Sequence, residues 1–469
     1  MNKRLGLNDV KMVEIPWSVP AVERALPEVP EHTYLQRVEQ VRELMEDNGY
    51  THVIVYGDRE HFANTRFLTG YDPRFEESLV IIGLEGKPLL LVGLEGLYYA
   101  AIAHGVEVEL YREFSLQGQP RHGRSFSEIL QSRNITSRSR VAVVGTKYAE
   151  TDDFSDAKIV SDVPYYLVDA LIRTCGIENV SDVTRWFTDS SKGIRIPLTV
   201  DEIARFEMIN QLVFSGVQNA IEALEPGVTE IDVSSKLGYD GSIPLSCHIV
   251  VGFGDNVNFA LRSPTNNKLK LGDQLSVALG VWGANIARTG IAIHDSDDLP
   301  EEIRDTLERV YVPYFDILHR WYRALKVGVS GKEVYDSVAI YVEDPFFQVQ
   351  LNAGHLIRDE EWINAPFRPD CEDELVSGTM IQCDIIVPAT PPYPGAHTED
   401  SLVLADASLR QELRTRFPEV WARIQKRRET MINVLGYELH EDVLPLCEMQ
   451  GQVTPFMLNP TQVLSMKKG

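Results

Sequence analysis

Three side chains in the last quarter of the chain have the types that acid–base chemistry or metal binding requires. Asp384 lies in the apolar run 380–387, where burying an isolated carboxylate is costly unless it is paired or bound to something. Glu399 lies just before the apolar run 401–404, and His397 precedes it by two positions. Two acids with a histidine nearby can move protons or hold a divalent cation. We therefore take these three residues as candidate site residues.

An internal repeat predicts the elements that bring these residues together. The segment 223–233 (ALEPGVTEIDV) is echoed by 324–334 (ALKVGVSGKEV), and in both copies a helix ends at Gly-Val before Thr or Ser caps the next helix. Paired strand-like segments follow each copy. These pairs are 274–279 with 286–293, and 380–387 with 401–404. One helix-and-hairpin unit used twice predicts an α+β domain with pseudo-two-fold symmetry, whose hairpins meet over a shared cleft.

The pseudo-symmetry also relates single positions on the two hairpins. Ala278 is expected to correspond to Asp384, and Asn285, at the start of its strand, is expected to face Glu399. The candidate acids therefore come from the second hairpin, and the first hairpin offers an amide in the same cleft.

The rest of the chain divides into further predicted regions. A Pro-rich arm covers 1–32, and a helix over 34–48 stops at Asn-Gly. β-branched runs then alternate with helical stretches, which predicts an α/β domain over 33–190. The α+β domain follows over 196–408, and the tail 409–469 is expected to be partly helical and partly extended.

Several short motifs, in this order and spacing, resemble the creatinase/prolidase/methionine aminopeptidase family, which is peptidase M24-like, includes Xaa-Pro aminopeptidases and has the pita-bread fold. They are Asn64 to Tyr71, Gly227 to Glu230, Leu269 to Asp273, Ala287-Arg288-Thr289, Gly354-His355, Ser377 to Met380, and Glu399-Asp400. The resemblance implies an α/β N-terminal creatinase-like domain followed by an α+β pita-bread domain.

The resemblance also implies a metal site, and here the sequence departs from the family. In its metallopeptidases two bridging Asp, one His and two Glu hold a pair of divalent metals. The matching positions are Ala278, Asn285, His355, Asp384 and Glu399. Alanine has no ligand atom and a neutral amide is a poor bridge between dications, so we expect no dinuclear centre and no cofactor. The alternative is one divalent metal on His355, Asp384 and Glu399.

Other family residues are also replaced. The positions of further family histidines hold Leu261, Leu351 and Trp362, and the position of a creatinase glutamate holds Ala287. We therefore expect neither the usual peptidase mechanism nor the complete creatinase set. The polar residues that remain are assigned as catalytic (His355, Asp384, Glu399) or substrate-binding (Arg288, His397, Asn285, Arg66), with pairing to Glu399 as the structural alternative for Arg288.

The resulting functional hypothesis is a metal-independent hydrolase that acts on a C–N bond of a small polar nitrogen compound. Two alternatives stay open. One is a non-catalytic pita-bread binding protein, and the other is a lyase or mononuclear-metal hydrolase of the same fold. The resemblance further implies a homodimer.

The composition of the chain excludes several classes of partner and location. The 469 residues include 45 Lys and Arg against 69 Asp and Glu, a net charge of −24, which argues against nucleic acid as a partner. No apolar run is long enough to span a membrane and the N-terminus shows no signal-peptide pattern. The five cysteines have no C-x-x-C spacing, so we expect a reducing, cytoplasmic location.

Overall fold

A computed structural model describes residues 3–17, 24–150, 152–259 and 261–467, and it divides the chain into two compact units. The N unit is Val29–Arg195, and the C unit combines Met1–Glu28 with Ile196–Gly469. Residues near both ends of the chain therefore belong to the unit that carries the candidate site.

The N unit is a mixed sheet covered on both faces. Its strand order is β5-β4-β3-β2-β6-β7, antiparallel between β2, β3 and β4 and parallel at the other pairs. The strands are β2 (His52–Gly57), β3 (Ser78–Gly83), β4 (Leu89–Val92), β5 (Glu107–Leu110), β6 (Val141–Val144) and β7 (Val180–Asp182). The helices are α1 (Glu31–Asn48), α2 (Ala63–Thr69), α3 (Gly96–Tyr99), α4 (Phe126–Ser132), α5 (Tyr165–Cys175) and α6 (Arg185–Thr188). The predicted α/β class of this region is confirmed.

Alternation along β2 explains the two-faced packing. Val53 and Val55 join one apolar cluster, while Ile54 and Tyr56 join the other. Because successive strand residues point to opposite faces, a continuous apolar run must be buried on both. The preceding helix α1 ends as predicted, at Gly49, whose φ of 70° suits a glycine.

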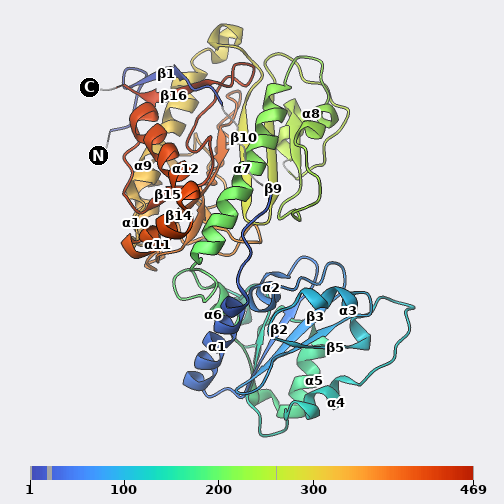
Figure 1. The fold of residues 1–469 in the computed structure, drawn as a ribbon. Helices are drawn as coiled ribbons and strands as arrows, with labels where there is room; N and C mark the ends of the chain where they lie inside the picture. The colour runs from blue at the N-terminus through green and yellow to red at the C-terminus, as the bar shows by residue number, and fades with distance from the viewer. Residues whose placement is uncertain (1–2, 18–23, 151, 260, 468–469) are drawn as a thin grey trace. The chain divides into compact units, whose positions relative to one another are not determined.

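The C unit repeats one helix-and-strand arrangement. Its first copy contains α7 (Val200–Glu222), α8 (Glu230–Lys236), β8 (Val250–Phe253), β9 (Gln274–Val281) and β10 (Ala284–Ile291). Its second contains α9 (Val312–Ala324), α10 (Gly331–Val342), β11 (His355–Leu356), β12 (Met380–Gln382), β13 (His397–Glu399) and β14 (Ser401–Leu404). Figure 1 shows α7 running beside the β9–β10 hairpin, which it contacts along its buried face.

The two copies match in their local hydrogen bonds. Thr229 and Ser330 each form a complete capping box at the start of α8 and α10. Just before them, the backbone N–H of Gly227 donates to Leu269 O at 2.8 Å, and that of Gly328 donates to Leu375 O at 2.8 Å. The predicted pseudo-two-fold α+β domain is therefore confirmed.

The chain ends complete the C unit. β1 (Val10–Glu14) pairs antiparallel with β16 (Gln462–Met466), and β15 (Val443–Pro445) extends the sheet that holds β14. The tail helices are α11 (Ala407–Arg416) and α12 (Pro418–Glu429), and a π-helical turn (Thr430–Leu435) follows. Within the described residues, every helix is too short or too polar to cross a membrane.

Candidate active site

The candidate site lies where the chain passes from one four-stranded sheet of the C unit to the other. β13 pairs with β10 in one sheet, and the chain then passes through Asp400 into β14, which pairs with β12 in the other. β11 places His355 opposite Gln382 at the edge of the second sheet. The sheet order therefore carries residues from distant parts of the chain to one point.

Asp384 lies beyond the end of its strand, which corrects the predicted strand over 380–387. β12 ends at Gln382 because the backbone then leaves the regular ladder. The N–H of Cys383 donates to Asp400 O at 2.9 Å, and Asp384 O accepts from Gly354 N–H at 3.0 Å. These two bonds hold the Asp384 side chain beside His355 and Glu399.

His355 faces a group of carboxylates without bonding directly to any of them. Its Nε2 lies 3.7 Å from Asp384 Oδ2, 4.0 Å from Glu399 Oε1 and 3.9 Å from Glu361 Oε1. Its Nδ1 lies 3.3 Å from Leu356 O. Since a carbonyl oxygen only accepts, we assign the hydrogen of a neutral ring to Nδ1, which leaves the Nε2 lone pair toward the acids.

Asn285 links two of these acids. Its Nδ2 donates to Glu399 Oε1 at 3.0 Å and to Glu361 Oε1 at 2.9 Å. Its Oδ1 is buried and has no hydrogen-bond partner among the described residues. The amide therefore acts toward the acids as a donor.

Glu361 is the site residue that sequence reasoning missed. It lies in the loop after β11, outside the repeat and outside every family motif. Its side chain reaches His355, Asn285 and Glu399. Its sequence signals were its position six residues after His355 and its place beside Trp362, and neither indicates where its side chain points.

The surroundings of the two candidate acids shift their pKa values in opposite directions. Burial raises the pKa of Glu399 well above its ordinary value, and the charges of Asp384 and Glu361 raise it further. Burial also acts to raise the pKa of Asp384, but the hydrogen bond from His397 Nε2 at 2.9 Å, with the charges of His397 and His355, outweighs it and lowers that pKa. The surroundings therefore favour the protonated form of Glu399 and the ionised form of Asp384.

Three positions that match family histidines have different surroundings. Leu261 and Leu351 are exposed, whereas Trp362 stacks on the His355 ring with centroids 4.1 Å apart. The indole therefore covers one face of His355, whose side chain is only 1% exposed.

Cys247 is half-buried near the site. A Cβ on Gly280 would meet Cys247 Cβ and the Asn285 amide, so both side chains border Gly280. Burial, followed by the charge of Glu361, raises the pKa of Cys247 to about 11. The group is a neutral thiol at pH 7 and is poorly suited to act as a nucleophile.

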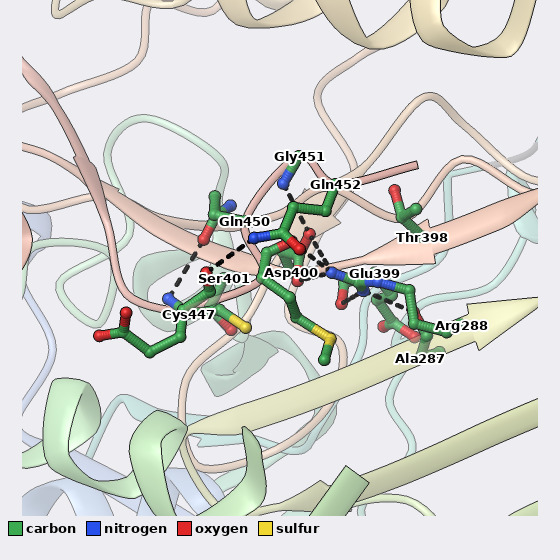
Figure 2. A network of polar contacts seen from close by, with 12 residues as sticks. Ala287, Arg288, Thr398, Glu399, Asp400, Ser401, Cys447, Gln450, Gly451 and Gln452 are labelled. Carbon is green, nitrogen blue, oxygen red and sulfur yellow. Dashed lines mark hydrogen bonds and ion pairs between the residues drawn. The ribbon is translucent and has the colours of Figure 1, made fainter. Parts of the chain in front are cut away.

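Arg288 does not lie among the site side chains, which corrects its assignment as a substrate contact. Figure 2 shows its guanidinium directed at Asp400, with Nη2 2.8 Å from Oδ1 and 3.0 Å from Oδ2. Both side chains are at most 1% exposed. The alternative pairing with the Glu399 carboxylate is also wrong, since only the Glu399 backbone O accepts from Arg288, at 3.2 Å.

Strand alternation explains this placement of Arg288. Ala287 pairs with Glu399 in the β10–β13 register, so their side chains share one face, and the neighbouring Arg288 and Asp400 point to the other. Arg66, the remaining predicted contact, lies in α2 of the N unit, where Nη1 is 3.4 Å from Gly70 O. Its part in the site stays a prediction.

The residues present do not fit the paired metal centre that the fold implies. Ala278 offers no ligand atom, and Asn285 presents N–H groups where a bridging oxygen would be needed. Two smaller groups have ligand atoms within 4.8 Å of one another, namely His355 with Glu361 and Glu399, and Asp384 with His397 and Glu399. In each group a hydrogen bond already engages at least one carboxylate.

Comparisons with known proteins agree with this architecture. Residues 206–406 match the model of metallopeptidase family M24, and no curated protein matches the chain. The prolidase from Pyrococcus horikoshii is 17% identical with a TM-score of 0.60, over 79% of this chain and 95% of that one. The Xaa-Pro dipeptidase from Bacillus anthracis is 15% identical with a TM-score of 0.60, over 80% and 96%.

A further similar structure is not described as a prolidase or a peptidase. The N-terminal domain of the FACT complex subunit SPT16 from chickpea, Cicer arietinum, is 14% identical with a TM-score of 0.54, over 81% of this chain and 95% of that one. At these identities the structures establish a shared fold alone. Residues 206–406 are therefore similar to metallopeptidase family M24, and the chain shares the fold of these solved structures.

Proposed function

We propose that this protein is a metal-independent hydrolase that cleaves a C–N bond in a small polar nitrogen compound. One observation carries the proposal: the pKa values of Glu399 and Asp384 are shifted in opposite directions, next to His355, whose Nε2 faces both carboxyl groups. Paired groups whose environments push their pKa values apart are the usual arrangement for general acid–base catalysis. The M24 fold supports the hydrolase class.

In this mechanism His355 is the general base. Its Nε2 accepts a proton from a water molecule, whose oxygen forms a bond to the carbon of the C–N group. Glu399 is the general acid and gives its proton to the departing nitrogen as the C–N bond breaks. The proton on His355 then returns to Glu399, which lies 4.0 Å away, so the atoms and charges balance over one turnover.

Neighbouring side chains orient Glu399 and stabilise the positive charge that forms on His355. Asn285 donates to Glu399 Oε1 and fixes the orientation of that carboxyl group. Ionised Asp384, held by His397, lies 3.7 Å from His355 Nε2 and stabilises the imidazolium that forms during the reaction. We therefore assign Asp384 and His397 to charge stabilisation rather than to proton transfer.

Two other functions are each favoured by one observation. The Trp362 stack and the burial of His355 favour a non-catalytic binding protein, because they limit access of a substrate to the base. The near-equal distances from His355 Nε2 to three carboxylates favour a lyase or hydrolase with one divalent metal.

The test is an assay of chelator-treated protein against small amides, ureas and amidines, with released amine measured by mass spectrometry. We expect turnover that survives chelation and is lost in Glu399→Gln, which keeps the shape of the acid without its transferable proton. Activity that requires added metal would support the single-metal alternative. Binding without turnover would support the binding protein. The homodimer and the cytoplasmic location stay predictions.

A further inference from the structure

The sheet that carries Glu399 places a second row of polar residues beside it. Glu399 pairs with Ala287 across β13 and β10. Two positions along β10, Thr289 pairs with Ser276 of β9 on one side and with His397 of β13 on the other. Paired residues of neighbouring strands share a face, and so do residues two apart on one strand. The row Ser276–Thr289–His397 therefore lies on the same face as Glu399.

Two side-chain contacts agree with this placement. Thr289 Oγ1 donates to Ser276 Oγ at 3.1 Å, so these two hydroxyl groups point to one side of the sheet. His397 Nε2 lies 2.9 Å from Asp384 Oδ1, within the candidate site. Ser276 and Thr289 are both half-buried. The pair of hydroxyl groups therefore extends the candidate site by one row along the sheet.

Small side chains adjoin Glu399 in its own row. Its partner in the register is Ala287, whose partner on β9 is Ala278. Each of these two residues adds only a methyl group above the sheet. The next row is about 7 Å away, because a strand rises about 3.3 Å per residue. A small molecule that lies over the two alanines can therefore reach both Glu399 and the hydroxyl pair.

The direction of the bond between the hydroxyl groups determines what this pair can bind. Thr289 uses its hydroxyl hydrogen in the bond to Ser276, whereas Ser276 keeps its own hydrogen for another acceptor. A hydroxyl group that accepts one hydrogen bond is polarised and becomes a better donor in the next. We therefore assign Ser276 as the donor to a ligand and Thr289 as the residue that polarises it.

The charge of the neighbouring groups favours a neutral acceptor. Carboxyl oxygens of Asp384, Glu361 and Glu399 all lie within 4.0 Å of His355 Nε2. A carboxylate ligand beside these acids would add a further negative charge and be repelled. A carbonyl oxygen accepts the same hydrogen bond without a net charge.

We propose that Ser276, polarised by Thr289, binds a neutral carbonyl oxygen of the substrate. This assignment rests on the proposed function, because it places the C–N bond to be cleaved between His355 and Glu399. The spacing of the two rows then describes the substrate. It is a small compound with a second carbonyl group, as in an amide or a ureido group, about five bonds from the carbon that water attacks.

The test is a ligand-observed NMR titration of the Glu399→Gln protein, in which binding is measured without turnover. The first probe is N-acetyl-β-alaninamide, which has two neutral carbonyl groups. The second is N-(3-methylbutyl)acetamide, which has nearly the same shape and lacks the second carbonyl, and the third is the carboxylate N-acetyl-β-alanine. We expect the first probe to bind about fivefold more tightly than either of the others, the worth of one hydrogen bond.

Variants in the same Glu399→Gln background locate this preference. Ser276→Ala should reduce it to less than about twofold, because the donor is removed. Thr289→Val keeps the shape of the side chain and should reduce it in part, which provides a second reading if Ser276→Ala does not fold. The matched control Ser235→Ala, at an exposed position of α8, should keep the full preference.

Three results would overturn the proposal, namely no saturable binding of the first probe, equal affinity for all three probes, or a preference that survives Ser276→Ala. Turnover of the first two probes by the wild type is measured separately. Hydrolysis of both with equal kcat/KM would refute the role of Ser276 and leave the hydrolase function standing. The expected binding preference without any hydrolysis would refute the hydrolase function and leave the binding role of Ser276 standing.

Discussion

Asn285 donates its side-chain N–H to Glu399 Oε1 at 3.0 Å, and this bond defines the electrostatics of the candidate site. A donor at this position stabilises a carboxyl oxygen without requiring a cation. The same amide also donates to Glu361 at 2.9 Å, so one neutral group partly offsets the closeness of two acids. The residue at 285 therefore keeps the acid cluster together in the absence of a bridging metal.

The first prediction follows from this bond. Asn285→Asp removes the donor and adds a carboxylate beside Glu361 and Glu399, so we expect the free energy of unfolding to fall by about 2 kcal/mol or more. Chemical denaturation in a chelating buffer measures the change. Asn266→Asp, at an exposed position, should stay within about 0.5 kcal/mol of the wild type. Equal stability of both variants would contradict the role given to Asn285.

The second prediction concerns pH. The pKa of Glu399 is raised in the folded protein, so its contribution to stability is full below its ordinary value of 4.5 and is lost as pH rises through the raised value. Glu399→Gln mimics the protonated acid and cannot ionise. We expect its melting temperature to fall less than that of the wild type between pH 5 and pH 9. Parallel curves for the two proteins would show that Glu399 is not held protonated.

The third prediction concerns the buried ion pair in Figure 2. Arg288→Met leaves the Asp400 carboxylate buried without its cationic partner, and we expect a loss of about 3–5 kcal/mol. The double variant Arg288→Met/Asp400→Asn should recover part of this loss, because no buried charge remains unpaired. A double-mutant cycle measured by chemical denaturation gives the coupling. Additive effects of the two changes would contradict the pairing.

The placement of this ion pair illustrates what could be predicted from the sequence. Helix caps, the internal repeat and the hairpins depend on local patterns, so Thr229, Ser330 and the strand segments reveal them directly. The partner of Arg288 depends on which strand face each residue occupies, and that information was available from strand alternation once β10 was assigned. The expected pairing of Arg288 with Glu399 fails because the register places these two side chains on opposite faces.

The loop residues of the site could not be predicted in the same way. Glu361 and Trp362 follow β11 in an irregular segment, so no periodicity fixes where their side chains point. Their contacts with His355 arise from the path of the loop, which depends on packing against distant parts of the chain. The motif-bearing residues were therefore identified, whereas the acid and the aromatic ring that complete the cluster were not.

The fourth prediction concerns the cover over His355. Trp362→Ala removes the ring stacked 4.1 Å from the imidazole, so we expect faster modification of His355 by diethylpyrocarbonate, by about tenfold. Peptide mass spectrometry measures the rate, and exposed His61 serves as the internal reference. An unchanged ratio of the two rates would show that access to His355 is controlled elsewhere.

The central claim is that His355, Asp384, Glu399 and Asn285 form an acid–base site and do not bind a catalytic metal. Elemental analysis tests it most directly, on protein equilibrated with Mn²⁺, Co²⁺ and Zn²⁺ and then freed of unbound metal by gel filtration. We predict well below one metal ion per chain, with no difference between the wild type and His355→Ala. One or more ions per chain in the wild type, lost in His355→Ala, would contradict the claim.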